Sequence, residues 1–123
     1  MSGQIRADVV QLLEDMVFWG RRTGDHIDGL DEDAFVADQK CCDAVCWCFV
    51  CIGEAASRIR QIDAEFVRLN PDLHLNSAVA MRHRLAHGYD GLDLFVVWRS
   101  ATDSIPSMVA SIEAKLRSRI GRP

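Results

Sequence analysis

Two arginines, two histidines and a tyrosine lie within residues 81–89, and their chemistry suits the cleavage of phosphodiesters. The segment reads Met-Arg-His-Arg-Leu-Ala-His-Gly-Tyr. A planar guanidinium matches the oxygens of a phosphate, and an imidazole exchanges protons near neutral pH. The 2′-hydroxyl of RNA can attack the adjacent phosphate once a base removes its proton. The segment therefore predicts an active site for RNA, and DNA, which lacks that hydroxyl, should resist.

Each polar residue of the segment receives a predicted role. We assign His87 as the general acid or base, and Arg82 as the residue that holds the phosphate and stabilises charge in the transition state. His83 and Arg84 are candidates for supporting contacts to RNA. Glu54 either orients an arginine of the segment or is a solvated helix charge. The reaction needs no metal ion or other cofactor, and it should leave a 2′,3′-cyclic phosphate and a 5′-hydroxyl.

Helical geometry constrains how these side chains can meet. Arg82 and His87 lie about 140° apart around a regular helix, whereas His83 and His87, at i and i+4, share one face. For Arg82 and His87 to address one phosphate, the helix must end near His87, where Gly88 follows, or a second subunit must bring its own copies to the same cleft.

The spacing from Arg82 over four residues to His87 and over one more to Tyr89 resembles the signature of the HEPN superfamily. The wider sequence resembles the HepT toxin family of prokaryotic toxin–antitoxin pairs. The resemblance implies an active-site cleft between two such signatures across a homodimer. Further family-like segments cover most of the chain, and they are 35–38, 43–45, 52–56 and 91–98.

The resemblance also implies a partner. In such pairs, of the type VII kind, a minimal nucleotidyltransferase antitoxin (MntA-like) attaches adenylate to the tyrosine of the motif, which is Tyr89 here. Added phosphate charge beside Arg82 would block the anion site. The alternative is a half-buried tyrosine that ties the helix end to the core. The chain departs from the family pattern at His83, where many relatives have Asn, and at Trp47 or Cys48, where several have a basic residue.

Length and composition are those of one globular domain, residues 1–123. The chain is 49% hydrophobic and 26% charged, and its net charge of −4 argues against broad, charge-driven binding of nucleic acid. RNA would have to meet a local basic patch. No apolar run approaches the ~20 residues that span a bilayer, and no signal-peptide core is present, so we expect a cytoplasmic protein.

Five cysteines crowd one predicted helix. Neighbours on a helix are poor disulfide partners, and a reduced compartment suits them. A thiolate metal site is conceivable, but the cysteines alternate with large apolar residues and lack a turn between them, so we interpret them as buried small apolar side chains. They are Cys41, Cys42, Cys46, Cys48 and Cys51.

Apolar periodicity predicts an all-α, up-and-down bundle of four to five helices. Asp31 and Asp93 are predicted N-caps, Asn70-Pro71-Asp72 should stop the long helix, and Pro106 should kink the last one. The predicted helices span about 4–22, a short turn over 34–36, 38–69, about 76–86 and the stretch that follows Asp93.

The long helix contains an unbroken apolar run, Ala44 to Ile52. A helix that is apolar on every side needs cover on every side, and a homodimer would supply it. The alternative is a central helix of a monomeric bundle.

Together these patterns predict a metal-independent endoribonuclease toxin that dimerises and is held in check by its antitoxin. The competing interpretation is a non-catalytic helical dimer that binds a nucleotide or a protein, in which Arg82 only anchors phosphate.

Overall fold

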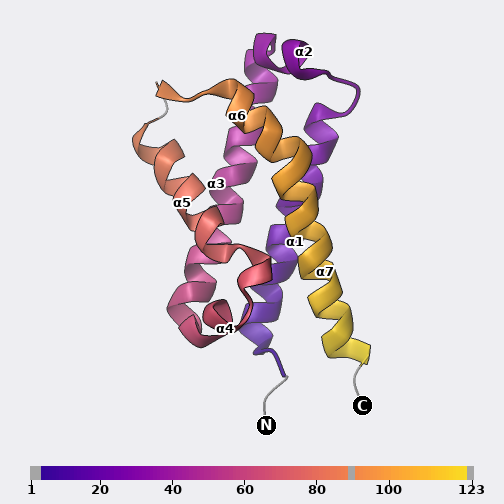
Figure 1. The fold of residues 1–123 in the computed structure, drawn as a ribbon, viewed down its shortest axis with the longest axis vertical. Helices are drawn as coiled ribbons and strands as arrows, with labels where there is room; N and C mark the ends of the chain where they lie inside the picture. Colours follow the sequence, from indigo (N-terminus) through magenta and orange to yellow (C-terminus); the bar gives the residue numbers. More distant parts are fainter. Residues whose placement is uncertain (1–3, 89–90, 122–123) are drawn as a thin grey trace.

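The computed structural model describes residues 4–88 and 91–121, with side chains up to 118, and every regular element in these ranges is helical (Figure 1). Tyr89, the predicted site of modification, lies outside the described residues. No described helix is long and apolar enough to cross a membrane. In chain order the elements are α1 (Ala7–Ile27), α2 (Glu32–Ala37), α3 (Gln39–Ile62), α4 (Ala64–Leu69), η1 (Pro71–Leu73), α5 (Leu75–His87), α6 (Leu94–Arg99), the π-helical turn η3 (Ser100–Ser104) and α7 (Ile105–Gly121).

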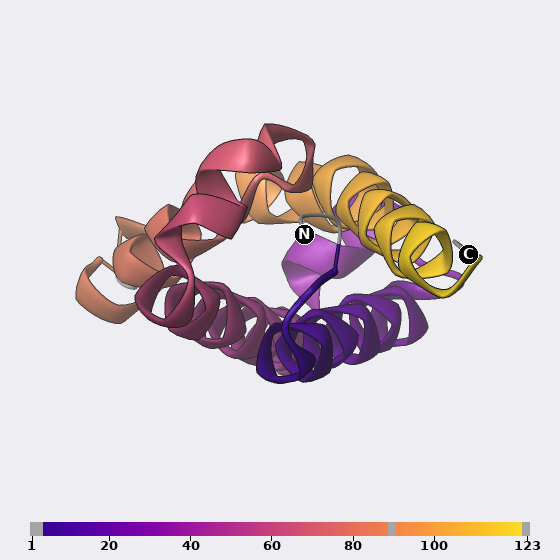
Figure 2. The same ribbon diagram turned by 90° about the horizontal axis from the view of Figure 1, so that it is seen from below.

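The long elements form an up-and-down bundle, which confirms the predicted fold class. Helix α3 packs against α1 on one side and α5 on the other, and α7 packs against α1. The end-on view shows α5 and α7 on opposite flanks of the α1–α3 pair (Figure 2). The fully buried side chains of the core come from nearly every element, and the largest are Phe35, Leu13, Met16, Ile52, Ile59, Leu73 and Ile112.

Helix α1 is longer than predicted. It continues past residue 22 to Ile27 and includes Gly24. Thr23 is fully buried against the bundle, and its hydroxyl donates to the Trp19 carbonyl at 2.9 Å within the helix. The chain turns only at Gly29, whose φ of +80° favours glycine.

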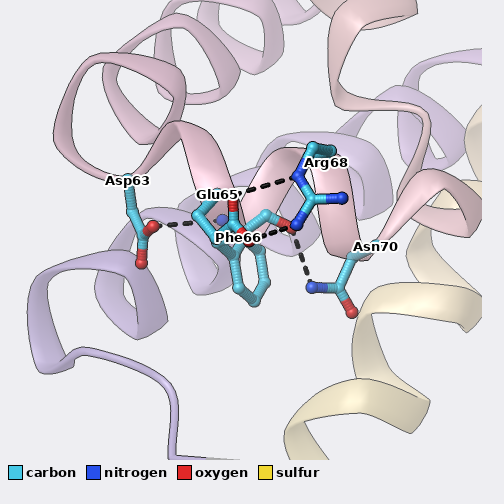
Figure 3. Close-up of polar contacts among 5 residues, drawn as sticks. All are labelled: Asp63, Glu65, Phe66, Arg68 and Asn70. Atoms are coloured by element: carbon cyan, nitrogen blue, oxygen red, sulfur yellow. Dashed lines mark hydrogen bonds and ion pairs between the residues drawn. The ribbon is translucent and has the colours of Figure 1, made fainter. Parts of the chain in front are cut away.

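The single helix predicted over 38–69 is wrong, because the chain breaks at Asp63. Asp63 adopts a non-helical conformation (φ −151°, ψ 78°), and its carboxylate accepts from the Phe66 amide at 3.0 Å to cap a new short helix, α4 (Figure 3). An Arg68–Glu65 ion pair and a 2.8 Å bond from the Asn70 amide to the Phe66 carbonyl hold the other end. Asp63, although it lies within an apolar pattern, is thus the N-cap of a new helix.

The remaining predicted boundaries agree closely with the structure. Asp31 and Asp93 accept from amides of α2 and α6, as N-caps should. The last helix is not simply kinked at Pro106. It passes through η3 first, where the Ile105 amide donates to the Ser100 carbonyl. Proline has no amide hydrogen to donate, and a π-turn is one way for a helix to accommodate the missing bond.

Burial on α3 is one-sided at the apolar run. Phe49 and Ile52 lie in the core, but Trp47 is 59% exposed and Val50 is half-buried. The bundle alone therefore leaves one apolar face of α3 uncovered.

Candidate active site

Helix α5 carries the motif and is fixed to α3 at very short range. Leu75 and Leu85 are buried on its inner face, and Gly53 of α3 lies directly under Arg82. A Cβ added at Gly53 would meet the Arg82 Cβ at 2.3 Å and the Ala78 carbonyl oxygen at 2.8 Å. Only glycine lets the two backbones approach this closely, so Gly53 sets the position of Arg82.

Glu54 joins Arg82 to a second arginine. Its Oε1 pairs with Arg82 Nη2 at 3.1 Å, and its Oε2 accepts from Arg58 Nε at 3.2 Å. Arg82 Nε is buried and has no hydrogen-bond partner among the described residues. The structure therefore agrees with the interpretation in which Glu54 contacts an arginine of the motif. Sequence reasoning did not assign Arg58 to the site, although its i+4 spacing from Glu54 was a signal.

His83 and His87 lie side by side, as their spacing predicts. Their ring centroids are 4.5 Å apart, with the planes inclined at 51°. Both line a hollow of about 460 Å³ between α5 and α6, which we call the histidine hollow. Its wall also includes Met81, Arg84, Gly88, Leu92, Asp93 and Val97.

Arg82 opens onto a different depression. With Glu54 and Arg58 it lines a groove of about 470 Å³ across α1, α3 and α5, which we call the Trp47 groove. Asp15 is a further charged residue of this groove, and its apolar part consists of Leu12, Trp19, Trp47, Val50, Cys51 and Ala55. Arg82 and His87 of one chain thus line separate depressions. The helix does end at His87, but that imidazole stays on the helical face beside His83.

Arg84 lines the histidine hollow, as does Asp93, but no ion pair of Arg84 is found among the described residues. Its only polar contact in that part of the chain is a weak one, from Nη2 to the Met81 sulfur at 3.9 Å. Its guanidinium is therefore available for an anion.

The cysteines pack as apolar side chains, which confirms their predicted burial. Cys41, Cys42, Cys46 and Cys48 are buried and unbridged, and Cys51 is half-buried. Burial raises the pKa of the Cys46 thiol to about 11. The thiols of Cys41 and Cys42 donate to the carbonyls of His26 and Phe35 at 3.2 and 3.1 Å. Thiols that stay protonated, and that donate a hydrogen bond to a backbone carbonyl, are poor metal ligands and poor nucleophiles.

The fold and the site define a small helical bundle that presents arginine and histidine side chains of one helix to two surface depressions. The family described as "Ribonuclease HepT-like" matches residues 9–114, and the chain belongs to this family. The resemblance seen in the motif is thereby confirmed, and membership makes the chain an enzyme of the ribonuclease class.

Individual relatives agree with the family assignment. The chain is 36% identical over 83 residues to a protein of Thermococcus cleftensis named "Probable ribonuclease HepT", a match that covers 68% of this chain and 72% of the relative. It is 25% identical over 109 residues to a Methanocaldococcus jannaschii protein named "Putative RNase", covering 89% of this chain and 84% of that relative. No solved structure matches the chain significantly.

Proposed function

We propose that this protein is a metal-independent endoribonuclease whose active site forms where two copies of the chain meet. In this site Arg82 of one subunit holds the phosphate and the partner subunit's His87 transfers the proton. The observation that carries the proposal is the separation of Arg82 and His87 into two depressions of one chain. A second copy is the simplest way to bring a guanidinium and an imidazole to one phosphate.

The exposed apolar face supports pairing of two chains. Trp47 is 59% exposed and stands in the groove that Arg82 borders. Burial of a large aromatic side chain that is exposed to water lowers the free energy, and tryptophan is enriched at protein interfaces. Covering this groove would remove water from around Arg82 and strengthen its interaction with a phosphate.

The reaction follows from the groups present. An imidazole takes the proton of the 2′-hydroxyl, the 2′-oxygen forms a bond to phosphorus, and the bond from phosphorus to the 5′-oxygen breaks. The leaving oxygen needs a proton, and His83, adjacent to His87, is the candidate donor. Arg82 and Arg84 neutralise the charge on the phosphoryl oxygens. Glu54 keeps Arg82 oriented through its 3.1 Å ion pair.

Control by a nucleotidyltransferase antitoxin belongs to the same proposal. Tyr89 follows the last helical residue, His87, by two positions. Adenylate attached there would bring a phosphate close to the arginines of α5 and compete with RNA. The reduced, buried cysteines suit the cytoplasm, where such a pair would act.

A cleavage assay tests the reaction. Wild-type protein, Arg82→Ala and His87→Ala are incubated with RNA in the presence of a chelator. We expect cleavage by wild type, with 2′,3′-cyclic phosphate and 5′-hydroxyl ends, and a loss of at least about a hundredfold in each variant. Folded wild type that binds but never cuts RNA would favour the non-catalytic nucleotide-binding module instead.

Mixing the two inactive variants tests the shared site. If Arg82 and His87 act from different subunits, a heterodimer of Arg82→Ala and His87→Ala keeps one complete site. After subunit exchange at equal amounts, roughly a quarter of wild-type activity should return. Activity that stays at the level of the single variants would show that each site draws both side chains from one chain.

A further inference from the structure

A cavity of about 240 Å³ lies between α3, α5 and the π-turn η3, and neither the reaction nor the dimer proposed above uses it. Phe49 and Ile52 of α3, Met81 of α5, and Ile105 and Met108 of α7 supply its apolar wall. We call it the π-turn cavity.

The polar side chains of the cavity come from two elements. His74 precedes α5, Ser77 and Arg84 lie on it, and Ser100 and Ser104 lie at the two ends of η3. A serine hydroxyl both donates and accepts hydrogen bonds. The π-turn matters because such turns are rare and occur often at functional sites. Apolar walls with a few hydroxyls are typical of a site for a small, flat, polar-edged molecule.

The cavity adjoins the histidine hollow. Met81 and Arg84 line both depressions, so they form the border between them. No aspartate or glutamate lines the π-turn cavity within the described chain, and Arg84 has no carboxylate partner there. The border therefore carries a guanidinium that no described carboxylate pairs with directly, although Asp93 lines the same hollow, and such a guanidinium favours a ligand whose anionic group lies at Arg84.

Size limits the ligand further. The cavity exceeds the ~150 Å³ that holds a benzene ring, yet it is smaller than the ~300–1,000 Å³ of sites for drug-sized ligands. It therefore has room to enclose about one heterocyclic base, and because Ser77, Arg84 and Ser104 are exposed, the rest of the ligand can continue outside it. A splayed base against apolar and aromatic side chains is also how proteins commonly recognise single-stranded RNA.

We infer that the π-turn cavity is a nucleobase subsite of the RNA substrate. It holds the base of the nucleotide whose 3′-phosphate is the scissile one, and Arg84, at the border of the cavity, contacts that phosphate beside His87. This inference rests on the proposed ribonuclease function. It adds that the enzyme requires an unstacked base next to the scissile linkage, and thus acts on single-stranded segments.

Binding measurements test the subsite separately from catalysis. Calorimetry with inorganic phosphate, hexanoate and the four nucleoside 3′-monophosphates uses the full chain carrying His87→Ala. Burial of one base against the apolar wall should make at least one nucleotide bind about tenfold tighter than phosphate. Ser104→Leu, which fills the cavity, should abolish this difference. Ser107→Leu, an exposed serine on α7 that does not line the cavity, should preserve it.

The outcomes separate the subsite from the proposed function. Tighter binding of nucleotide that Ser104→Leu abolishes supports the subsite even if wild type never cuts RNA. Equal binding of nucleotide and phosphate, or equal binding of hexanoate and nucleotide, overturns it even if RNA is cut. If Ser104→Leu does not fold, Ser77→Leu on α5 replaces it. In cleavage assays, an abasic residue beside the cut should lower kcat/KM about tenfold in wild type and leave it unchanged in Ser104→Leu, and an unchanged wild-type rate would refute the inference.

Discussion

Gly53 of α3 and Arg82 of α5 pack so closely that a methyl group at residue 53 would lie 2.3 Å from the Arg82 Cβ. The contact connects the packing of the bundle to the chemistry of the motif. A substitution at residue 53 should therefore displace Arg82, the proposed phosphate-binding residue, without changing the chemistry of its side chain.

Gly53→Ala should impair both stability and activity. The added methyl group also meets the Ala78 backbone oxygen at 2.8 Å, so the two helices must separate. We expect the free energy of unfolding to fall by about 1–3 kcal/mol, as for other overpacked cores, together with a clear drop in kcat. Urea unfolding and RNA cleavage would measure the two effects. Gly24→Ala is the matched control, because nothing lies near Gly24 in α1, and it should stabilise by up to about 1 kcal/mol.

Glu54→Gln should reduce activity more than stability. The Glu54–Arg82 pair is partly exposed, so its loss should change the free energy of unfolding by less than about 1 kcal/mol. Arg82 would nevertheless lose the carboxylate that orients it, and kcat/KM should fall severalfold. Glu65→Gln, which removes a comparable exposed pair with Arg68, should leave cleavage unchanged. Wild-type rates in Glu54→Gln would exclude a positioning role for Glu54.

Trp47→Asp should yield a folded monomer without ribonuclease activity. An aspartate in the exposed part of the Trp47 groove, which Asp15 and Glu54 also line, would place like negative charges in a paired interface while leaving the core intact. Sedimentation velocity and circular dichroism report the oligomeric state and the fold. Leu69→Asp, at an equally exposed apolar residue on α4, serves as the control and should behave like wild type. An active, monomeric Trp47→Asp would contradict the shared site.

Alkaline pH should destabilise the protein through its buried thiols. Burial raises the pKa of Cys46 to about 11, above the ~8.5 of a free cysteine, so the folded state keeps a proton that the unfolded chain loses. This contribution to stability is complete below about pH 8.5 and is lost as the pH rises to about 11. Urea midpoints measured between pH 8 and 11 should fall progressively. Cys46→Ala should flatten part of that slope, and an unaltered slope would assign the effect to other groups.

Local patterns predicted much of the fold and of the motif. The caps at Asp31 and Asp93 and the pairing of His83 with His87 depend on neighbours a few residues away, and the structure has each of them. The break at Asp63 was missed, because a capping aspartate within an apolar pattern is indistinguishable from a solvated one.

The sequence by itself determined an all-helical bundle and a motif of arginines and histidines on one helix, because helical period, capping and side-chain spacing are set by residues close together in the chain. Only the tertiary structure decided that Gly53 lies under Arg82, that Glu54 contacts two arginines, and that Arg82 and His87 open onto separate depressions. These relationships depend on the rotation and distance of α5 relative to α3 and α6. Packing of many side chains, remote from one another in sequence, fixes that rotation and distance.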